Sequence, residues 1–330
     1  MVLRAGELGR RDFIRVLGAG AALLPAFGRA GVAQAIGPKK ARVALVSTTD
    51  RKQGVHQALK LMDLSGARGK QVVIKPNFNS ADDTPGSTHN DTLSQLVMEL
   101  HEANARSVTL GESSGPPKTQ GVMEKKGTFD LSKEFRFDVV DYEQIGEQDW
   151  VKFPSTNWPD GFSLPRLVVE SDYNVSTCCL KTHGFGGVFT MSLKLSVGLT
   201  PKPIRRTMHA SPNMRRMIAE LNTGYHPDLV VLDGVSAFTD GGPSRGELKA
   251  GNVIIAGTDR VAVDAVGVAM LKLLGANQAI MSKKIFEQEQ LQRAVELKLG
   301  VESADAIELI TGDAESQKTA NALRQILALG

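Results

Sequence analysis

The sequence predicts an α/β protein whose sheet is mostly parallel or mixed and is flanked by helices, with one loop-rich insertion. From residue 36 onward, short β-branched and apolar runs alternate with amphipathic stretches, which is the pattern of strands joined by covering helices. Hydrophobic residues make up 42% of the 330 residues and charged residues 23%, a balance typical of globular proteins. Since neither of the two irregular stretches in this part of the chain has enough apolar pattern for a domain of its own, residues 36–330 are expected to form a single domain.

The apolar runs predict eight strands, at residues 42–47, 71–75, 107–110, 138–141, 173–180, 229–232, 252–256 and 306–310. A helix is predicted over residues 91–103, where apolar residues recur three and four positions apart. Another is predicted over residues 260–274, because Asp259 is a favourable capping residue and Gly275 follows the run.

Two stretches lack this regular pattern. Residues 128–165 are rich in Asp, Glu, Gln, Phe, Trp and Pro and have weak helical periodicity, so they are predicted to form the loop-rich insertion. Residues 200–212 hold three prolines and four basic residues and are expected to join two helices as a flap.

The N-terminal segment resembles a twin-arginine export signal. Arg10 and Arg11 precede Phe13, and the apolar run over residues 16–27 is shorter than the roughly 20 residues that span a bilayer. Residues 33–35 offer a small-x-small cleavage site. The sequence therefore predicts a signal at residues 1–35, the twin-arginine translocase as a partner, a periplasmic or secreted location, and no stable membrane span after cleavage. A frayed amphipathic helix is the alternative.

The charge distribution argues against nucleic acid as a partner. Residues 1–35 contain five arginines and two acidic residues, which account for the whole formal charge of +3. The remainder of the chain has no net charge, few aromatic residues and no cluster of Lys and Arg. It therefore lacks the basic patch that typically binds nucleic acid or a membrane surface.

Cys178 and Cys179 are the two cysteines of the sequence. Since they are adjacent on a predicted strand, their side chains should point to opposite faces of the sheet and pack as small hydrophobic groups. Two adjacent cysteines exclude a disulfide framework and a cysteine-ligated iron-sulfur cluster.

Polar residues follow four of the predicted strands. Lys75 and Asn77 follow the second strand, Glu112 the third, residues 181–183 the fifth and Asp233 the sixth. Because the carboxyl ends of parallel strands share one edge, these residues are expected to converge on one crevice. The alternative is that strand ends simply meet solvent. The candidate catalytic residues are Lys181, His183, Lys194, Glu112 and Asp233, and the candidate substrate-binding residues are Lys75, Asn77, His89, Thr182, Gly184, Gly186, Gly187 and Glu247.

The glycine-rich segment after His183 is predicted to turn from a strand into a helix that begins at Val188. Free N–H groups at such a turn form a cradle for an anion. The segment lacks the third glycine of the dinucleotide fingerprint and is not a P-loop.

Lys194 and Asp264 each interrupt an otherwise apolar helical run. A buried charge must be solvated, paired or functional. Lys194 can reach water from a helix edge or act in the site, whereas the shorter Asp264 is expected to form a buried pair or cap a helix. His89 can likewise cap the helix that follows it.

Residues 111–115 match the nucleophile-elbow pattern, but no histidine follows a suitable acid, so Glu112 is the better candidate there, as a ligand or base. A divalent metal, if one is bound, would need distant ligands such as Glu112, Asp233, Glu247 and His183, which favour a hard cation.

Five motifs in this order and spacing resemble the family called domain of unknown function 362, over roughly residues 40–312. They are residues 73–77 with Thr88 and His89, 180–184 with Lys194, 228–234, 242–249, and 258–265. The resemblance implies an α/β fold and, since some members carry ferredoxin-like cysteine motifs, a redox setting. This chain lacks those cysteines and has Leu195 where the family usually has Asn.

Two functions follow as hypotheses. The first is an exported enzyme, redox or metal-assisted, that binds a small anionic molecule at the carboxyl ends of the strands. The second is a periplasmic anion-binding protein without turnover, which would need a hinge between two lobes.

Overall fold

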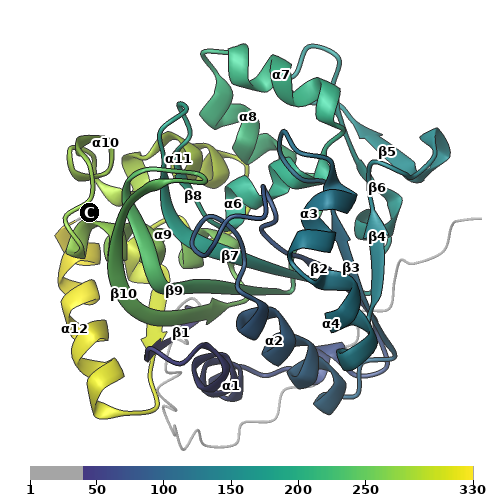
Figure 1. Ribbon diagram of the computed structural model, residues 1–330. Coiled ribbons are helices and arrows are strands. Elements are labelled where there is room, and N and C mark those ends of the chain that lie inside the picture. The colour runs from purple at the N-terminus through teal and green to yellow at the C-terminus, as the bar shows by residue number, and fades with distance from the viewer. Residues whose placement is uncertain (1–39, 330) are drawn as a thin grey trace, which may run out of the picture. The chain divides into compact units, whose positions relative to one another are not determined.

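The computed structural model describes residues 40–329, so the predicted export signal lies outside the described residues. Within this range nine strands form one mixed sheet of order β11-β1-β10-β9-β7-β2-β3-β4, with β8 paired to β7 (Figure 1). Its strands are β1 (Ala41–Ser47), β2 (Gln71–Lys75), β3 (Ser107–Glu112), β4 (Asp138–Asp141), β7 (Tyr173–His183), β8 (Val188–Thr190), β9 (Leu229–Gly241), β10 (Gly246–Gly257) and β11 (Ile307–Ile310). The α/β fold class predicted from the sequence is confirmed.

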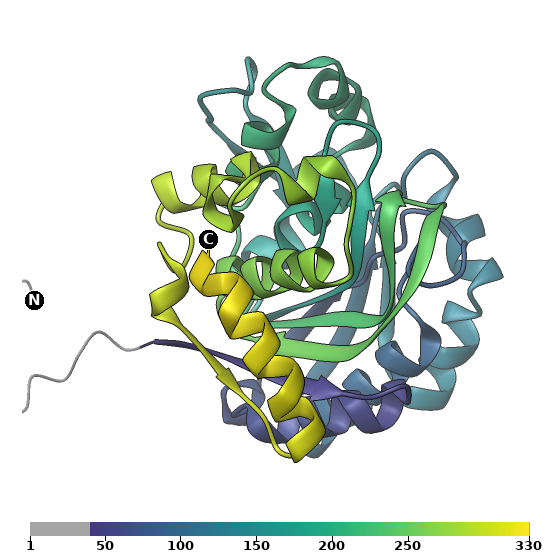
Figure 2. The ribbon, with the colours of Figure 1, turned by 90° about the vertical axis from the view of Figure 1, so that its left-hand side faces the viewer.

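Helices cover both faces of this sheet (Figure 2). One face packs against α1 (Arg51–Leu61), α2 (Asn90–Glu102), α3 (Thr119–Lys125) and α4 (Thr128–Phe135). On the other side lie α6 (Ser192–Leu195), α7 (Lys202–Ala210), α8 (Met214–Leu221), α9 (Arg260–Leu273), α10 (Gln278–Met281), α11 (Glu289–Glu296) and α12 (Ala314–Leu329), of which α7 and α11 pack against other helices of this layer. Short 3-10 helices lie at Ser65–Ala67, Glu147–Asp149, Ser196–Leu199, Ile285–Glu287 and Ala304–Ala306.

Strand alternation divides the buried residues between the two faces. In β9, Val230 and Leu232 pack with α9, whereas Val231 packs with α1 and α2. Cys178 belongs to the α9 side, and Cys179 lies beside Thr88 on the other, as predicted for adjacent cysteines. Each such fully buried aliphatic side chain contributes about 1.5–3 kcal/mol of hydrophobic stabilisation.

Side-chain caps define where the two predicted helices begin. His89 Nδ1 accepts a hydrogen bond from the backbone N–H of Asp91 at the start of α2. Asp259 accepts hydrogen bonds from the N–H groups of Val261 and Ala262 at the start of α9. Both capping predictions are confirmed, and such caps typically stabilise a helix by about 1 kcal/mol.

The strands β9 and β10 are longer than predicted, because they pair antiparallel with each other beyond their apolar segments. Those extensions contain Gly, Asp, Ser and Lys, so they lack the apolar alternation that identifies a strand. The turn between the two strands includes Gly241 and Gly242, both with positive φ. A Cβ on Gly242 would lie 2.1 Å from the carbonyl oxygen of Thr182, so only glycine fits there.

The two irregular stretches are more ordered than predicted. In residues 128–165, α4 and β4 belong to the main layers, and the loop-rich part is limited to the remainder, which includes the hairpin β5 (Trp150–Phe153) and β6 (Phe162–Pro165) and leads to α5 (Arg166–Val169). The flap expected at residues 200–212 is the helix α7. Its prolines lie at the N-cap and in the first turn, where a backbone N–H has no helical partner to lose.

Among residues 40–329, no helix has the length and apolar character needed to cross a membrane.

Candidate functional site

The strands β2, β3, β7 and β9 are parallel neighbours, so their carboxyl ends lie at one edge of the sheet. A cavity of about 1040 Å³ opens at this edge. Its walls come from the ends of β2, β3 and β7, the turn from β7 to β8, α6 and the 3-10 helix after it, α7, and the turn from β9 to β10.

Most of the charged side chains that line the cavity are cationic. Its lysines and arginines are Lys75, Lys194, Lys202, Arg205, Arg206 and Arg245. His183 and His209 also line it, and Glu112 is the one acidic side chain among the described residues that does. This excess of positive charge favours an anionic ligand.

A buried ion pair forms one wall. Lys75 Nζ lies 2.6 Å from Glu112 Oε1, and both side chains are almost completely buried. The carboxylate also accepts hydrogen bonds from the backbone N–H groups of Phe78 and Ser113. Burial lowers the pKa of Lys75, and Glu112 partly offsets this effect. A Cβ on Gly198 would lie 2.7 Å from Lys75 Nζ, so the glycine leaves room for the pair.

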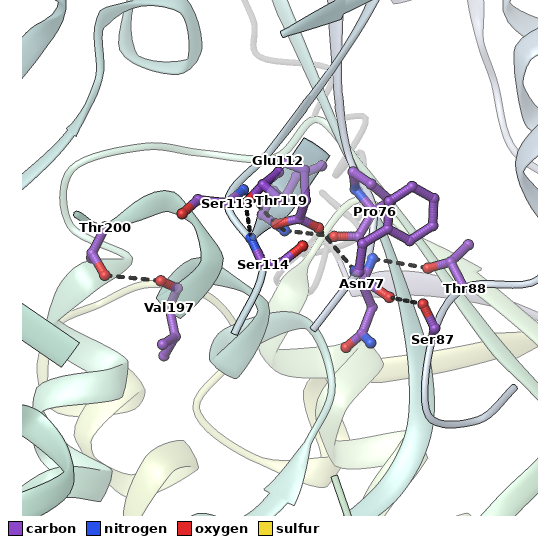
Figure 3. Close-up of polar contacts among 12 residues, drawn as sticks. Pro76, Asn77, Ser87, Thr88, Glu112, Ser113, Ser114, Thr119, Val197 and Thr200 are labelled. Carbon is purple, nitrogen blue, oxygen red and sulfur yellow. Dashed lines mark hydrogen bonds and ion pairs between the residues drawn. The ribbon is translucent and has the colours of Figure 1, made fainter. Parts of the chain in front are cut away.

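The loop after β2 is held by its own hydrogen bonds (Figure 3). The backbone N–H of Asn77 donates to Thr88 Oγ1, and Ser87 Oγ donates to the carbonyl oxygen of Asn77. The side-chain amide of Asn77 donates to the carbonyl oxygen of Gly86 at 3.1 Å. Asn77 therefore lines the cavity while it also stabilises the loop.

Lys194 is buried without a partner. The residue is 8% exposed, and within residues 40–329 its Nζ forms no hydrogen bond or ion pair. Burial, with Lys181 and Arg205 nearby, lowers the pKa of Lys194 to about 7. Asp264 fixes the turn that carries this lysine, because its carboxylate accepts hydrogen bonds from the N–H groups of Ser192 (2.7 Å) and Leu193 (2.9 Å). The helix-capping role predicted for Asp264 is confirmed.

His183 lies beside Lys194 in its neutral form. Burial, with Lys194 and His209 nearby, lowers the pKa of His183 to about 2. Its Nδ1 accepts a hydrogen bond from the N–H of Gly187 at 3.2 Å, so the proton of the neutral ring is on Nε2. The ring of His209 is nearly parallel to that of His183, at a centroid distance of 6.3 Å.

Arg205 fastens α7 to the end of β3. Its guanidinium donates hydrogen bonds to the carbonyl oxygens of Thr200 and Ser114 and to the hydroxyl of Ser113. Burial lowers the pKa of Arg205 to about 10. With its donors used in this way, Arg205 positions the helix and adds positive charge to the cavity wall.

The sequence matches the model of the family described as "Domain of unknown function (DUF362)" over residues 72–269, which is more than half of the chain. The chain belongs to the DUF362 family. One relative is the "Thylakoid-associated protein sll1697" of Synechocystis sp., with 25% identity over 213 residues, 62% of this chain and 64% of the relative. The match thus spans less than two thirds of that relative's length.

A solved structure with a similar chain is that of the lactate racemase apoprotein from Thermoanaerobacterium thermosaccharolyticum. The TM-score is 0.48 at 16% sequence identity, and the match covers 71% of this chain and 58% of the other. A similarity of this degree says nothing about activity.

In this DUF362 chain, six of the candidate catalytic and substrate-binding residues predicted from the sequence line the cavity. They are Lys75, Asn77, Glu112, His183, Gly184 and Lys194. Lys75, Asn77, Glu112 and His183 lie at the ends of three parallel strands, as predicted, whereas Gly184 and Lys194 lie in the turn and the helix that follow β7.

Lys181 and Asp233 do not line the cavity. Lys181 is 0% exposed and its Nζ donates hydrogen bonds to the carbonyl oxygens of Gly86 (2.7 Å) and Pro243 (2.9 Å), so it ties two loops together. The carboxylate of Asp233 accepts hydrogen bonds from Arg51 and Thr92. Both residues stabilise the fold beside the site.

Five other nominated residues also lie outside the cavity lining. Thr182 Oγ1 donates to backbone carbonyl oxygens of β9, His89 caps α2, and Glu247 is exposed beside Lys249. Gly186 and Gly187 belong to the turn between β7 and β8.

The prediction that this glycine-rich turn opens a helix at Val188 is wrong. Val188 begins β8, which pairs antiparallel with β7 through His183. The positive φ of Gly186 and Val188 reverses the chain into a hairpin, so no helix dipole points at the cavity from this segment.

The basic residues of α7 were not predicted to belong to the site. The helix carries Lys202 and, three, four and seven residues after it, Arg205, Arg206 and His209. This spacing places all four on one face of a helix. The three prolines of this stretch obscured that pattern.

The metal ligands suggested by the sequence do not form a site. Glu112 and His183 line the cavity, whereas Asp233 and Glu247 lie elsewhere. Over the described residues 40–329, no group of three or more His, Cys, Asp or Glu side chains is placed to hold a metal ion.

Proposed function

We propose that this protein is an enzyme that binds a small organic anion in the cavity and uses Lys194 to transfer a proton. The α/β fold and DUF362 membership are compatible with an enzyme. The observation that carries the proposal is the buried, unpaired amine of Lys194, which faces a cavity whose other charged groups are largely cationic.

The bound anion supplies the partner that Lys194 lacks. In the protein without ligand the pKa of Lys194 is lowered to about 7, and a bound anion stabilises the ammonium, which then donates its proton to the substrate as a general acid. The Nε2–H of His183 and the hydroxyl of Thr190 supply directional hydrogen bonds, since Thr190 Oγ1 is buried without a partner among the described residues. Arg206 and Arg245, exposed at the rim, attract the anion by long-range charge.

Isothermal titration calorimetry with small carboxylates and phosphate esters tests the binding step. We expect at least one anion to bind the protein, and Lys194→Met to weaken that binding at least about tenfold, since a charge-assisted hydrogen bond is lost. Lys60→Met is the matched control, because Lys60 is an exposed lysine of α1 outside the cavity lining. Equal affinities of the Lys194 and Lys60 variants would contradict the proposal.

Turnover is then measured by following each bound anion by NMR during incubation with the protein. Conversion that is lost in Lys194→Met supports an enzyme. Recovery of every bound anion unchanged would favour the anion-binding protein without turnover.

We also propose export by the twin-arginine route, on the sequence of residues 9–15. Replacement of Arg10 and Arg11 by lysine should leave the full-length protein in the cytoplasmic fraction of its host. Export that continues in this variant would contradict the proposed route.

A further inference from the structure

Phe185 is an exposed aromatic residue at the cavity. It lies in the turn between β7 and β8, lines the cavity, and is 71% exposed. A large apolar side chain left in water at a binding site gains stabilisation when a ligand covers it. Phe185 therefore offers a contact surface for an apolar part of the ligand.

Phe185 belongs to a row of three rings. Its ring meets that of His183 edge to face at a centroid distance of 6.0 Å, and His209 stacks beyond His183 at 6.3 Å. Because burial keeps His183 neutral, its ring can contact another ring without the cost of desolvating a charge. All three rings line the cavity.

The size of the cavity argues for a ligand with a body beyond its anionic group. At about 1040 Å³ it lies at the upper end of the range of pockets that enclose drug-sized molecules. Its lining also includes apolar residues from three different segments, Phe78 after β2, Pro116 after β3 and Leu195 at the end of α6. An inorganic anion would leave these surfaces without contact.

The aromatic row and the buried amine meet at one place. A Cβ built on Gly187 would lie 2.8 Å from both His183 Nδ1 and Lys194 Cε. A ligand group that contacts the ring of His183 is therefore only a few bonds away from one that contacts Lys194.

We propose, building on the function proposed above, that the substrate is an aromatic anion whose carboxylate or phosphate pairs with Lys194 and whose ring packs against Phe185. The ring and the anionic group are separated by at most a short linker, because Phe185 and Lys194 both lie beside His183. An aryl carboxylate and an aryl phosphate share this chemistry.

Calorimetric titration with benzoate, acetate, phenyl phosphate and inorganic phosphate tests the proposal and compares the two anionic groups. For whichever anionic group, carboxylate or phosphate, binds more tightly, we expect the probe with a ring to bind at least about tenfold tighter than the probe without one. Phe185→Ala should weaken the ring-bearing probe by about three- to tenfold and leave the ring-free probe within about twofold. Since Phe185 is exposed, this variant should unfold in urea at the wild-type midpoint.

Phe185→Leu separates an aromatic contact from a merely apolar one. We expect it to resemble Phe185→Ala, and wild-type affinity in the leucine variant would overturn the aromatic assignment. Ring-free probes that bind as tightly as ring-bearing ones would also overturn it, while the binding step of the proposed function would stand if Lys194→Met still lost affinity. Failure of all four probes to bind would count against both proposals.

Discussion

Lys75 and Glu112 form an ion pair, 2.6 Å between Nζ and Oε1, that is buried where β2 and β3 end at the cavity. The carboxylate has further donors in two backbone N–H groups, whereas Lys75 donates in addition to a backbone carbonyl oxygen. Such a pair offsets much of the cost of burying its own charges, but each charge depends on the other.

Removal of one member of this pair should therefore destabilise the protein strongly. Lys75→Met leaves the Glu112 charge buried without its cation, and we expect the free energy of unfolding to fall by about 3–5 kcal/mol. Urea denaturation measures this loss. The double variant Lys75→Met/Glu112→Gln should lose less than the sum of the two single variants, and a strictly additive loss would show that the two charges do not interact.

Lys194→Met should have the opposite effect on the protein without ligand. The pKa of Lys194 is lowered to about 7 from its usual 10.5, so the charged form is disfavoured by folding and this cost is fully present below pH 7. We expect the variant to be more stable than the wild type at pH 6 by about 0.5–2 kcal/mol, and the difference to shrink as the pH rises from 7 towards 10. A destabilised variant at pH 6 would mean that Lys194 has a favourable partner.

Anion binding should weaken as the pH rises through 7. A bound anion stabilises the ammonium of Lys194, so above pH 7 binding takes up a proton, and the association constant should fall by up to about tenfold per pH unit between pH 7 and 9. His183 does not titrate in this interval, because its pKa is lowered to about 2. Titrations in buffers of different ionisation enthalpy count the protons taken up, and Lys194→Met should abolish the uptake.

Asp264→Asn should loosen the turn that carries Lys194. An amide has one carbonyl oxygen and directs N–H donors at the backbone, so one of the N–H groups of Ser192 and Leu193 loses its acceptor at a cost of about 1–3 kcal/mol. We expect a lower urea midpoint and weaker anion binding. Asp305→Asn, at an exposed acid outside the cavity lining, is the control, and equal affinities in the two variants would show that Asp264 does not position Lys194.

Periodicity located most of the sheet, because the strands that cross the core are apolar on both faces. The polar residues at strand ends correctly predicted that Lys75, Glu112 and His183 lie at one cavity, and Lys194 was identified as a charge within an apolar helical run. The sequence does not distinguish the role of Lys181 from that of Lys194, since both follow apolar residues and both are buried. The two lysines differ because Lys181 meets carbonyl oxygens that lie 95 and 62 residues away in the chain, and such contacts have no local pattern.

The conformation of the turn between β7 and β8 could not be predicted from the sequence. The segment after His183 contains glycines that suit either a helix start or a hairpin, and the positive φ of Val188, a β-branched residue, is a conformation that sequence preference argues against. Pairing with β7 overrides that preference.

Strand β1 pairs with β10 and β11, both more than 200 residues later in the chain. During synthesis, β1 therefore cannot pair on both sides until nearly all of the protein has been made. Until then the apolar side chains of β1 lack their packing partners in β10 and β11. Completion of the sheet is thus a late event in folding, and shortened chains that end before residue 307 would keep one side of β1 open to aggregation.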